Sequence, residues 1–150
     1  MICTSSIKSS ERGSTLLEFA IGATVFLSVM FAVLEFGRAL WVHNALTDAA
    51  RRGARYAVIH AATDADSVKN VVVYGDPNPA NGTQPVVNNL TTDNVIVTYS
   101  NFGLETGTVS VSITNYQFQF VVPLIGTTIQ MPAYTTTLTG ESVGLVPPNL

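Results

Sequence analysis

A long uncharged run near the N-terminus dominates the hydrophobic pattern of the chain. Residues 19–34 carry no charge, and Glu18 and Glu35 border this run seventeen residues apart. At about 1.5 Å per residue this distance is roughly 26 Å of helix, close to the roughly 30 Å hydrocarbon core of a bilayer. Trp41 lies just beyond, where an amphipathic ring suits the lipid–water interface. The pattern predicts a transmembrane helix over about residues 16–41.

Two other interpretations of the run stay open from the pattern alone. A secretory signal has such an apolar part, but Glu18 interrupts it near its start and no small-x-small cleavage pattern follows. A buried core helix needs protein on every side, and the rest of the chain is too small and too polar to supply it.

The residues after the apolar run continue the helical pattern. The segment 35–60 contains no proline and is rich in alanine, leucine and arginine. We therefore expect one long helix from about Ser14 to about His60, softened at Gly37 and Gly53. The first half of this helix lies in lipid, and its second half projects out.

Charged residues of the second half fall at helical pairing distances. Arg38 follows Glu35 by three residues and can pair with it on one face. Arg51, Arg52 and Arg55 form a basic group that meets anionic lipid headgroups or a partner helix, or is simply a solvated helix face. The candidates for membrane-interface or partner contact are Glu35, Arg38, Trp41, Arg51, Arg52 and Arg55.

Residues 62–93 connect the long helix to the later part of the chain. Residues 64–75 predict a short helix with Asp64 at its N-cap, although the apolar residues 71–74 fit a strand equally well. The segment 75–93 is rich in turn-forming residues and predicts a loop, in which Asn81-Gly82 is the clearest turn.

Beyond residue 93 the pattern becomes strand-like, with apolar residues at every second position. These positions are Val95, Val97, Tyr99, Val109, Val111 and Ile113. The apolar parity switches near residues 114–115, which predicts a β-bulge or a bend. A third strand follows in residues 127–140, and Pro132 places it at an edge or a bulge. We expect an α+β fold in which about three antiparallel strands pack on the projecting half of the long helix.

The charge distribution divides the chain into two parts. All seven lysines and arginines lie at or before Lys69, and 26 of the 81 residues from Asn70 onward are serine, threonine or asparagine. This composition is common in exported bacterial domains. The net charge of −3 gives no reason to expect nucleic-acid binding. The single cysteine, Cys3, excludes an intrachain disulfide and a cysteine-based metal site.

Catalytic and metal-binding patterns find little support. His43 and His60 have no further ligand at metal-binding spacing, and we expect His43 on the helix surface near the membrane. Asp76, Asn78 and Asn81 can ligate calcium on geometry alone, but a solvated turn is the better interpretation because acidic residues are few. We expect neither an enzyme nor a cofactor or metal site.

Three segments carry a family resemblance, namely "RGSTLLEFA", "LEFGRAL" and "ALTDAARRGARYA". In the first, Gly13 is followed by four residues, then by Glu18-Phe19 and the apolar span. Together these segments, within residues 12–58, resemble the TadE-like family, minor pilin or pseudopilin components of the Tad (Flp, type IVc) pilus machinery. The resemblance implies a type IV pilin-like fold. The expected regions are a leader at 1–13, the long helix at 14–61, a short helix and loop at 62–93, and the sheet region at 94–150.

The resemblance implies that a prepilin peptidase cleaves between Gly13 and Ser14 and removes residues 1–13. Glu18 then becomes the fifth residue of the mature chain, and Glu18 and Phe19 are the implied assembly residues. A carboxylate costs about 2.5–3.5 kcal/mol at the centre of a span, and less near an end. The new α-ammonium at Ser14 of a neighbouring subunit offsets this cost, unless Glu18 merely snorkels to the interface.

The implied partners are the prepilin peptidase, other TadE-like and TadF-like pseudopilins, the major Flp pilin, the inner-membrane assembly platform and the lipid bilayer. The implied location is the inner membrane, crossed once, with the N-terminus in the cytoplasm and the C-terminal part in the periplasm or in an extracellular pilus. Basic residues do not orient the span by themselves, since Lys8 and Arg12 on one side face four arginines on the other. The alternative function is a membrane-tethered extracytoplasmic binding module unrelated to pilus assembly.

Overall fold

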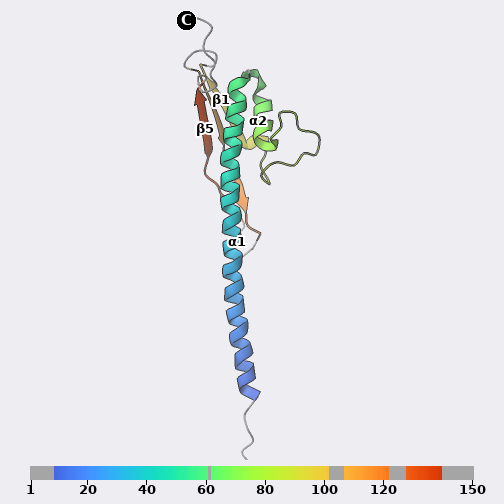
Figure 1. The fold of residues 1–150 in the computed structure, drawn as a ribbon, viewed down its shortest axis with the longest axis vertical. Coiled ribbons are helices and arrows are strands. Elements are labelled where there is room, and N and C mark those ends of the chain that lie inside the picture. The colour runs from blue at the N-terminus through green and yellow to red at the C-terminus, as the bar shows by residue number, and fades with distance from the viewer. Residues whose placement is uncertain (1–8, 61, 102–106, 122–127, 140–150) are drawn as a thin grey trace, which may run out of the picture. The chain divides into compact units, whose positions relative to one another are not determined.

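The computed structural model describes residues 9–60, 62–101, 107–121 and 128–139. Their elements are α1 (Ser9–Ile59), η1 (Ala62–Asp64), α2 (Ala65–Tyr74), η2 (Thr92–Asn94), β1 (Val95–Ser100), β2 (Thr108–Ile113), β3 (Gln117–Gln119), β4 (Thr128–Gln130) and β5 (Tyr134–Thr139). The chain divides between Arg38 and Ala39 into two compact units, and the second unit holds the end of α1, α2 and the strands (Figure 1). The expected α+β fold, a long N-terminal helix followed by a small antiparallel sheet, is confirmed.

The helix α1 is continuous over 51 residues. At about 1.5 Å per residue, this is about 77 Å of helix. It contains no proline, and its backbone stays helical through Gly37 and Gly53. The helix is therefore not interrupted at either glycine, and its softening there stays a prediction.

Gly53 instead allows a close approach of α2 and β2 to α1. A Cβ atom at this position would overlap Cγ2 of Val72 and lie 3.4 Å from Cγ1 of Val111. Ala49 and Ala57 of α1 are also fully buried. A glycine inside a helix costs about 1 kcal/mol relative to alanine. The packing of valine side chains against bare helix backbone offsets that cost.

The segment with two open interpretations, residues 64–75, forms the helix α2. Val68, Val71 and Val72 are buried at helical spacing, so the alternative strand over residues 71–74 is wrong. Asp64 occupies the N-cap position, but its side chain makes no capping hydrogen bond. Gly75 ends the helix with a left-handed φ of 79°, and its N–H donates to the carbonyl oxygen of Val71 at 3.0 Å.

The strands β1, β2 and β5 form one antiparallel sheet in the order β1-β2-β5. Val95 pairs with Ile113, which pairs with Tyr134, and all three side chains are buried in the core with α1 and α2. The alternation predicted for the first two strands is therefore confirmed. The other face of the sheet consists of Ile96, Thr98, Ser100, Thr108, Ser110, Ser112, Thr135, Thr137 and Thr139.

The parity switch predicted near residues 114–115 is a bend between two sheets. Asn115 adopts a left-handed φ of 57°, and β3 then pairs with β4 in a separate two-stranded sheet. The segment expected as a single third strand is two strands, β4 and β5, with Pro132 in their connection. A proline has no N–H to donate, so it interrupts a strand ladder at this point.

The connecting residues 75–93 form the predicted loop, with η2 at its end. Gly82 has a positive φ of 88° in the predicted Asn81-Gly82 turn. The N–H of Val86 donates to the carbonyl oxygen of Val73 at 2.8 Å, which holds the loop against the end of α2.

Candidate functional site

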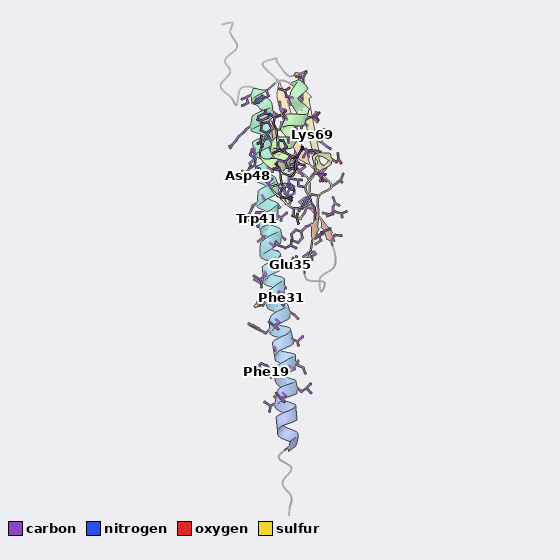
Figure 2. All side chains as sticks on the ribbon, turned by 90° about the vertical axis from the view of Figure 1, so that its right-hand side faces the viewer. Phe19, Phe31, Glu35, Trp41, Asp48 and Lys69 are labelled. Atoms are coloured by element: carbon purple, nitrogen blue, oxygen red, sulfur yellow. The ribbon has the colours of Figure 1, made fainter. Side chains whose placement is uncertain are left out.

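The first half of α1 exposes a nearly unbroken series of large apolar side chains. Phe19 is 73% exposed, and Figure 2 shows Phe19 and Phe31 projecting outward from the helix. The exposed apolar residues here are Leu16, Leu17, Phe19, Ile21, Val25, Phe26, Leu27, Val29, Met30, Phe31, Val33 and Leu34. Within the described residues one helix, over 13–59, is long and apolar enough to cross a membrane, and none of its most apolar window is buried. Lipid tails or other apolar helices are the natural surroundings of such a surface.

The few hydroxyl groups in this apolar segment are satisfied within the helix. Thr24 Oγ1 donates to the carbonyl oxygen of Ala20, and Ser28 Oγ donates to the carbonyl oxygen of Thr24, each at 2.8 Å. A hydroxyl that is bonded to its own helix backbone adds little cost in lipid, where no water can replace the bond. The segment is thus suited to an apolar environment despite its polar residues.

The predicted processing and assembly residues lie close together near the start of α1. Gly13, Ser14, Glu18 and Phe19 are all exposed. Apart from its chain neighbours and the backbone of its own helix, no atom of a described residue lies within 4 Å of the position that a Cβ of Gly13 would take. Glu18 follows Ser14 by four residues, a spacing at which groups on one helix meet. In the part of the chain that the structure describes, Glu18 forms no ion pair.

Glu35 and Arg38, at the other border of the apolar run, form the predicted ion pair. Arg38 Nη2 donates to Glu35 Oε2 at 2.8 Å. Glu35 is only 6% exposed, whereas the Arg38 side chain is 39% exposed. The buried carboxylate therefore has a compensating cation that reaches the surface. Trp41, six residues beyond Glu35, is 59% exposed, as an interface residue requires.

The predicted basic group is not a single cluster. Arg52 Nη1 lies 3.3 Å from Asp48 Oδ2, and this arginine is half-buried. Arg51 and Arg55 are exposed and form no ion pair with any described residue. Arg51 and Arg55 therefore leave their positive charges exposed, while Arg52 is paired with Asp48.

A contact between His43 and Tyr134 was not predicted from the sequence. His43 is exposed on the helix, as expected, but its Nδ1 lies 2.9 Å from the hydroxyl of Tyr134 on β5. The two rings meet edge to face at a centroid distance of 5.2 Å. Burial raises the pKa of Tyr134, and the nearby Tyr116 adds to this rise. The two residues are 91 positions apart, and no local pattern links them.

The loop that carries Asp76, Asn78 and Asn81, the residues that can ligate calcium on geometry alone, forms a local turn at Asp76. The N–H of Asn78 donates to Asp76 Oδ1 at 2.9 Å, the bond of an Asx turn. Among the described residues, no three His, Cys, Asp or Glu side chains come together in a way that could hold a metal ion.

Comparison with protein families finds a match that lies in the long helix α1. Residues 13–55 match the model of the TadE family, described as TadE-like protein. The match begins at Gly13 and lies wholly within α1. The resemblance seen in the sequence is thereby confirmed for this segment. The family is of the pilin type, a class of structural proteins associated with pilus systems. The chain has no significant match among curated proteins or solved structures.

Proposed function

We propose that this chain is a minor pilin or pseudopilin of a Tad (Flp, type IVc) pilus assembly system. The first half of α1 crosses the inner membrane once, with the N-terminus in the cytoplasm and the sheet-bearing unit in the periplasm. The subunit packs through α1 beside other TadE-like and TadF-like pseudopilins and the major Flp pilin, on the inner-membrane assembly platform. It thereby initiates, caps or supports the pilus.

One coincidence supports this proposal most. The helix that matches the TadE-like family is also the helix whose first half exposes its apolar side chains. Lipid alone would cover such a surface, but a plain anchor needs no carboxylate at its border. Glu18 is exposed at that border, in the spacing after Gly13 that type IV prepilins share. The match, the apolar surface and the carboxylate together favour an assembly subunit over a simple tether.

Processing by a prepilin peptidase removes residues 1–13 and leaves Ser14 as the new N-terminus. The structure begins α1 at Ser9, so the bond between Gly13 and Ser14 lies inside a helix. Peptidases act on extended backbone, so the first turns of α1 open before cleavage. Helix ends fray at low free-energy cost, and no described residue outside its own helix turn packs closely at Gly13 to oppose opening.

Once the leader is gone, a cation compensates the negative charge of Glu18. The α-ammonium at Ser14 of a neighbouring subunit is the proposed partner, and this pairing sets the axial register between subunits. The α-ammonium of the same chain also lies four residues away on the helix, at pairing distance. An intrachain pair would neutralise Glu18 without holding subunits together, so only assembly assays separate the two arrangements.

N-terminal sequencing of the membrane-extracted protein tests the proposal. With an active prepilin peptidase the chain is expected to begin at Ser14, and without the peptidase at Met1. Gly13→Val is expected to block cleavage, because the peptidase must bind the backbone at this residue closely. Gly22→Val is the matched control, since Gly22 is also an exposed glycine of α1, and no described residue outside its own helix turn lies within 4 Å of a Cβ there.

Two outcomes contradict the proposal. A chain that keeps Met1 in the presence of an active peptidase favours a membrane-tethered binding module unrelated to pilus assembly. A chain trimmed within residues 19–34 favours a cleaved secretory signal. In either case the pilus assignment fails.

A further inference from the structure

Arg51 and Arg55 form a basic ridge on the outer side of α1. Gly53 lies midway between them and packs against Val72 of α2. Successive residues of an α-helix are turned by about 100°, so each arginine lies about 160° around the helix from Gly53. The basic ridge therefore points away from α2 and from the core of the second unit.

Lipid headgroups are a poor partner for the basic ridge. Arg51 and Arg55 lie ten and fourteen residues beyond Trp41, which corresponds to about 15 and 21 Å along the helix. The attraction between exposed charges is screened over about 8 Å at physiological ionic strength. With Trp41 at the interface, most of the ridge stands beyond that range, so an acidic protein surface fits it better.

The second unit carries such a surface on the side of α2. Asp76 directly follows Gly75, which ends α2, and Asp93 lies in η2, which contacts α2. Both carboxylates are exposed, and neither forms an ion pair with a residue that the structure describes. No lysine or arginine follows Lys69 in the sequence, so the later half of the chain offers them no cation. We refer to Asp76 and Asp93 as the acidic side.

The basic ridge and the acidic side also lie at matching levels along α1. Val72 packs against Gly53, which is the midpoint of the ridge. Asp76 follows Val72 by four residues, and residues 73–75 between them belong to the end and cap of α2. Measured along the axis of α1, Asp76 therefore lies within about 10 Å of Gly53. Two copies with the same orientation can therefore meet side by side without a large axial shift.

We propose that the basic ridge of one copy of this chain binds the acidic side of a second copy. The two surfaces lie on opposite sides of each copy, so the contact is heterologous and repeats from copy to copy. The contact rests on the proposed function, because subunits that share one membrane and one assembly have the same orientation. Opposite charges across it guide the encounter and set the register.

Cysteine crosslinking of the full chain in membranes tests this contact. The only native cysteine is Cys3, so Cys3→Ser gives a background without thiols. In this background, Ile59→Cys combined with Asn78→Cys is treated with a bis-maleimide, because these exposed positions neighbour Arg55 and Asp76 and leave all four charges of the contact in place. A ladder of dimers, trimers and larger species is expected, because each copy uses both surfaces. Ile59→Cys with Thr98→Cys is the control, since Thr98 is exposed on the outer face of the sheet, and it is expected to give about tenfold less product.

Charge reversal gives an independent readout. Arg51→Glu reverses a charge on the basic ridge, and Asp93→Lys reverses a charge on the acidic side. Each of these single changes is expected to lower crosslinking by about tenfold. The double change restores opposite charges and is expected to recover the ladder, which a folding defect would not do. Crosslinks only to other proteins, or equal yields from the Thr98 control, overturn the proposal.

The same samples separate this contact from the proposed function. A chain that begins at Ser14 but forms no ladder refutes the contact and leaves the pilin assignment intact. A chain that keeps Met1 but still forms the ladder supports the contact and refutes the pilin assignment.

Discussion

Arg38 Nη2 lies 2.8 Å from Glu35 Oε2, one helical turn earlier on α1. The carboxylate is buried and the guanidinium extends to the surface, so the two residues close the apolar run with a neutral pair. Glu18 borders the other end of the run without an ion pair among the described residues. Among the described residues, the two borders therefore differ in that only the one at Glu35 carries an ion pair.

This difference predicts that substitutions at the two borders of the apolar run have different effects: loss of assembly at Glu18, and loss of stability at the Glu35–Arg38 pair. Glu18→Ala is expected to leave cleavage at Ser14 largely intact but to abolish incorporation into the pilus machinery, because the missing carboxylate no longer pairs with a neighbour's α-ammonium. Co-purification with other pseudopilins, together with N-terminal sequencing, measures both steps. Normal incorporation of Glu18→Ala contradicts the intersubunit pair and leaves the intrachain or snorkelling arrangement.

Removal of Arg38 is expected to destabilise the protein, because it leaves the buried Glu35 carboxylate without its cation. Arg38→Gln should cost about 1–3 kcal/mol in the free energy of unfolding, measured by denaturant titration in detergent micelles. The double variant Glu35→Gln/Arg38→Gln removes both charges and is expected to be more stable than Arg38→Gln alone. If the double variant is the less stable one, burial of the charge is not the source of the loss.

Two of the glycines in α1, Gly37 and Gly53, predict opposite responses to alanine. Gly53→Ala introduces a Cβ that overlaps Val72, so it should cost about 1–3 kcal/mol by overpacking. A Cβ in Gly37→Ala meets no described residue outside its own helix turn within 4 Å and improves helix propensity, so this change should stabilise by about 0.5–1 kcal/mol. Thermal unfolding followed by circular dichroism compares them. A stabilising Gly53→Ala would mean that α2 moves aside without loss.

Alkaline pH is expected to destabilise the second unit through its tyrosines. Burial raises the pKa of Tyr99, to which the charge of Asp64 adds, and burial likewise raises the pKa of Tyr134. The raised pKa means that folding favours the neutral phenol. This contribution is fully present below the ordinary pKa of about 10 and is lost as pH rises through the folded-state value, because the unfolded chain ionises first.

Unfolding temperatures measured from neutral to strongly alkaline pH check this prediction. Tyr99→Phe and Tyr134→Phe remove one ionising group each, so each variant should lose less stability above pH about 10 than the parent protein does. Tyr134→Phe also loses the bond to His43, so it starts from a lower stability at neutral pH. An identical alkaline decline in both variants and the parent contradicts the assignment to these tyrosines.

Features that depend on near neighbours in the sequence were predictable. The absence of proline and the run of residues 19–34 predict the long helix, and i,i+3 spacing predicts the Glu35–Arg38 pair. Period-two alternation predicts β1 and β2, because successive strand residues face opposite sides of a sheet. The family pattern around Gly13 and Glu18 is likewise local, and the family match begins at the same glycine.

Features that depend on which elements pack against a segment could not be predicted from the sequence and were established only by the tertiary structure. The valines at 71–73 fit a strand or a helix by their sequence, and in the structure they lie on a helix whose Val72 packs against Gly53. A left-handed Asn115 directs the chain into a second sheet, which a change in apolar parity alone does not distinguish from a bulge.

The sequence by itself thus determined the apolar helix, its charged borders and the family to which this segment is similar, because these rest on spacing along one element. Only the tertiary structure decided that Gly53 is a packing site, that His43 meets Tyr134, and that Arg51 and Arg55 point away from the core while Arg52 is paired. The physical reason is that the side of a helix that is buried, and the strand residue that lies opposite it, are set by elements distant in the chain.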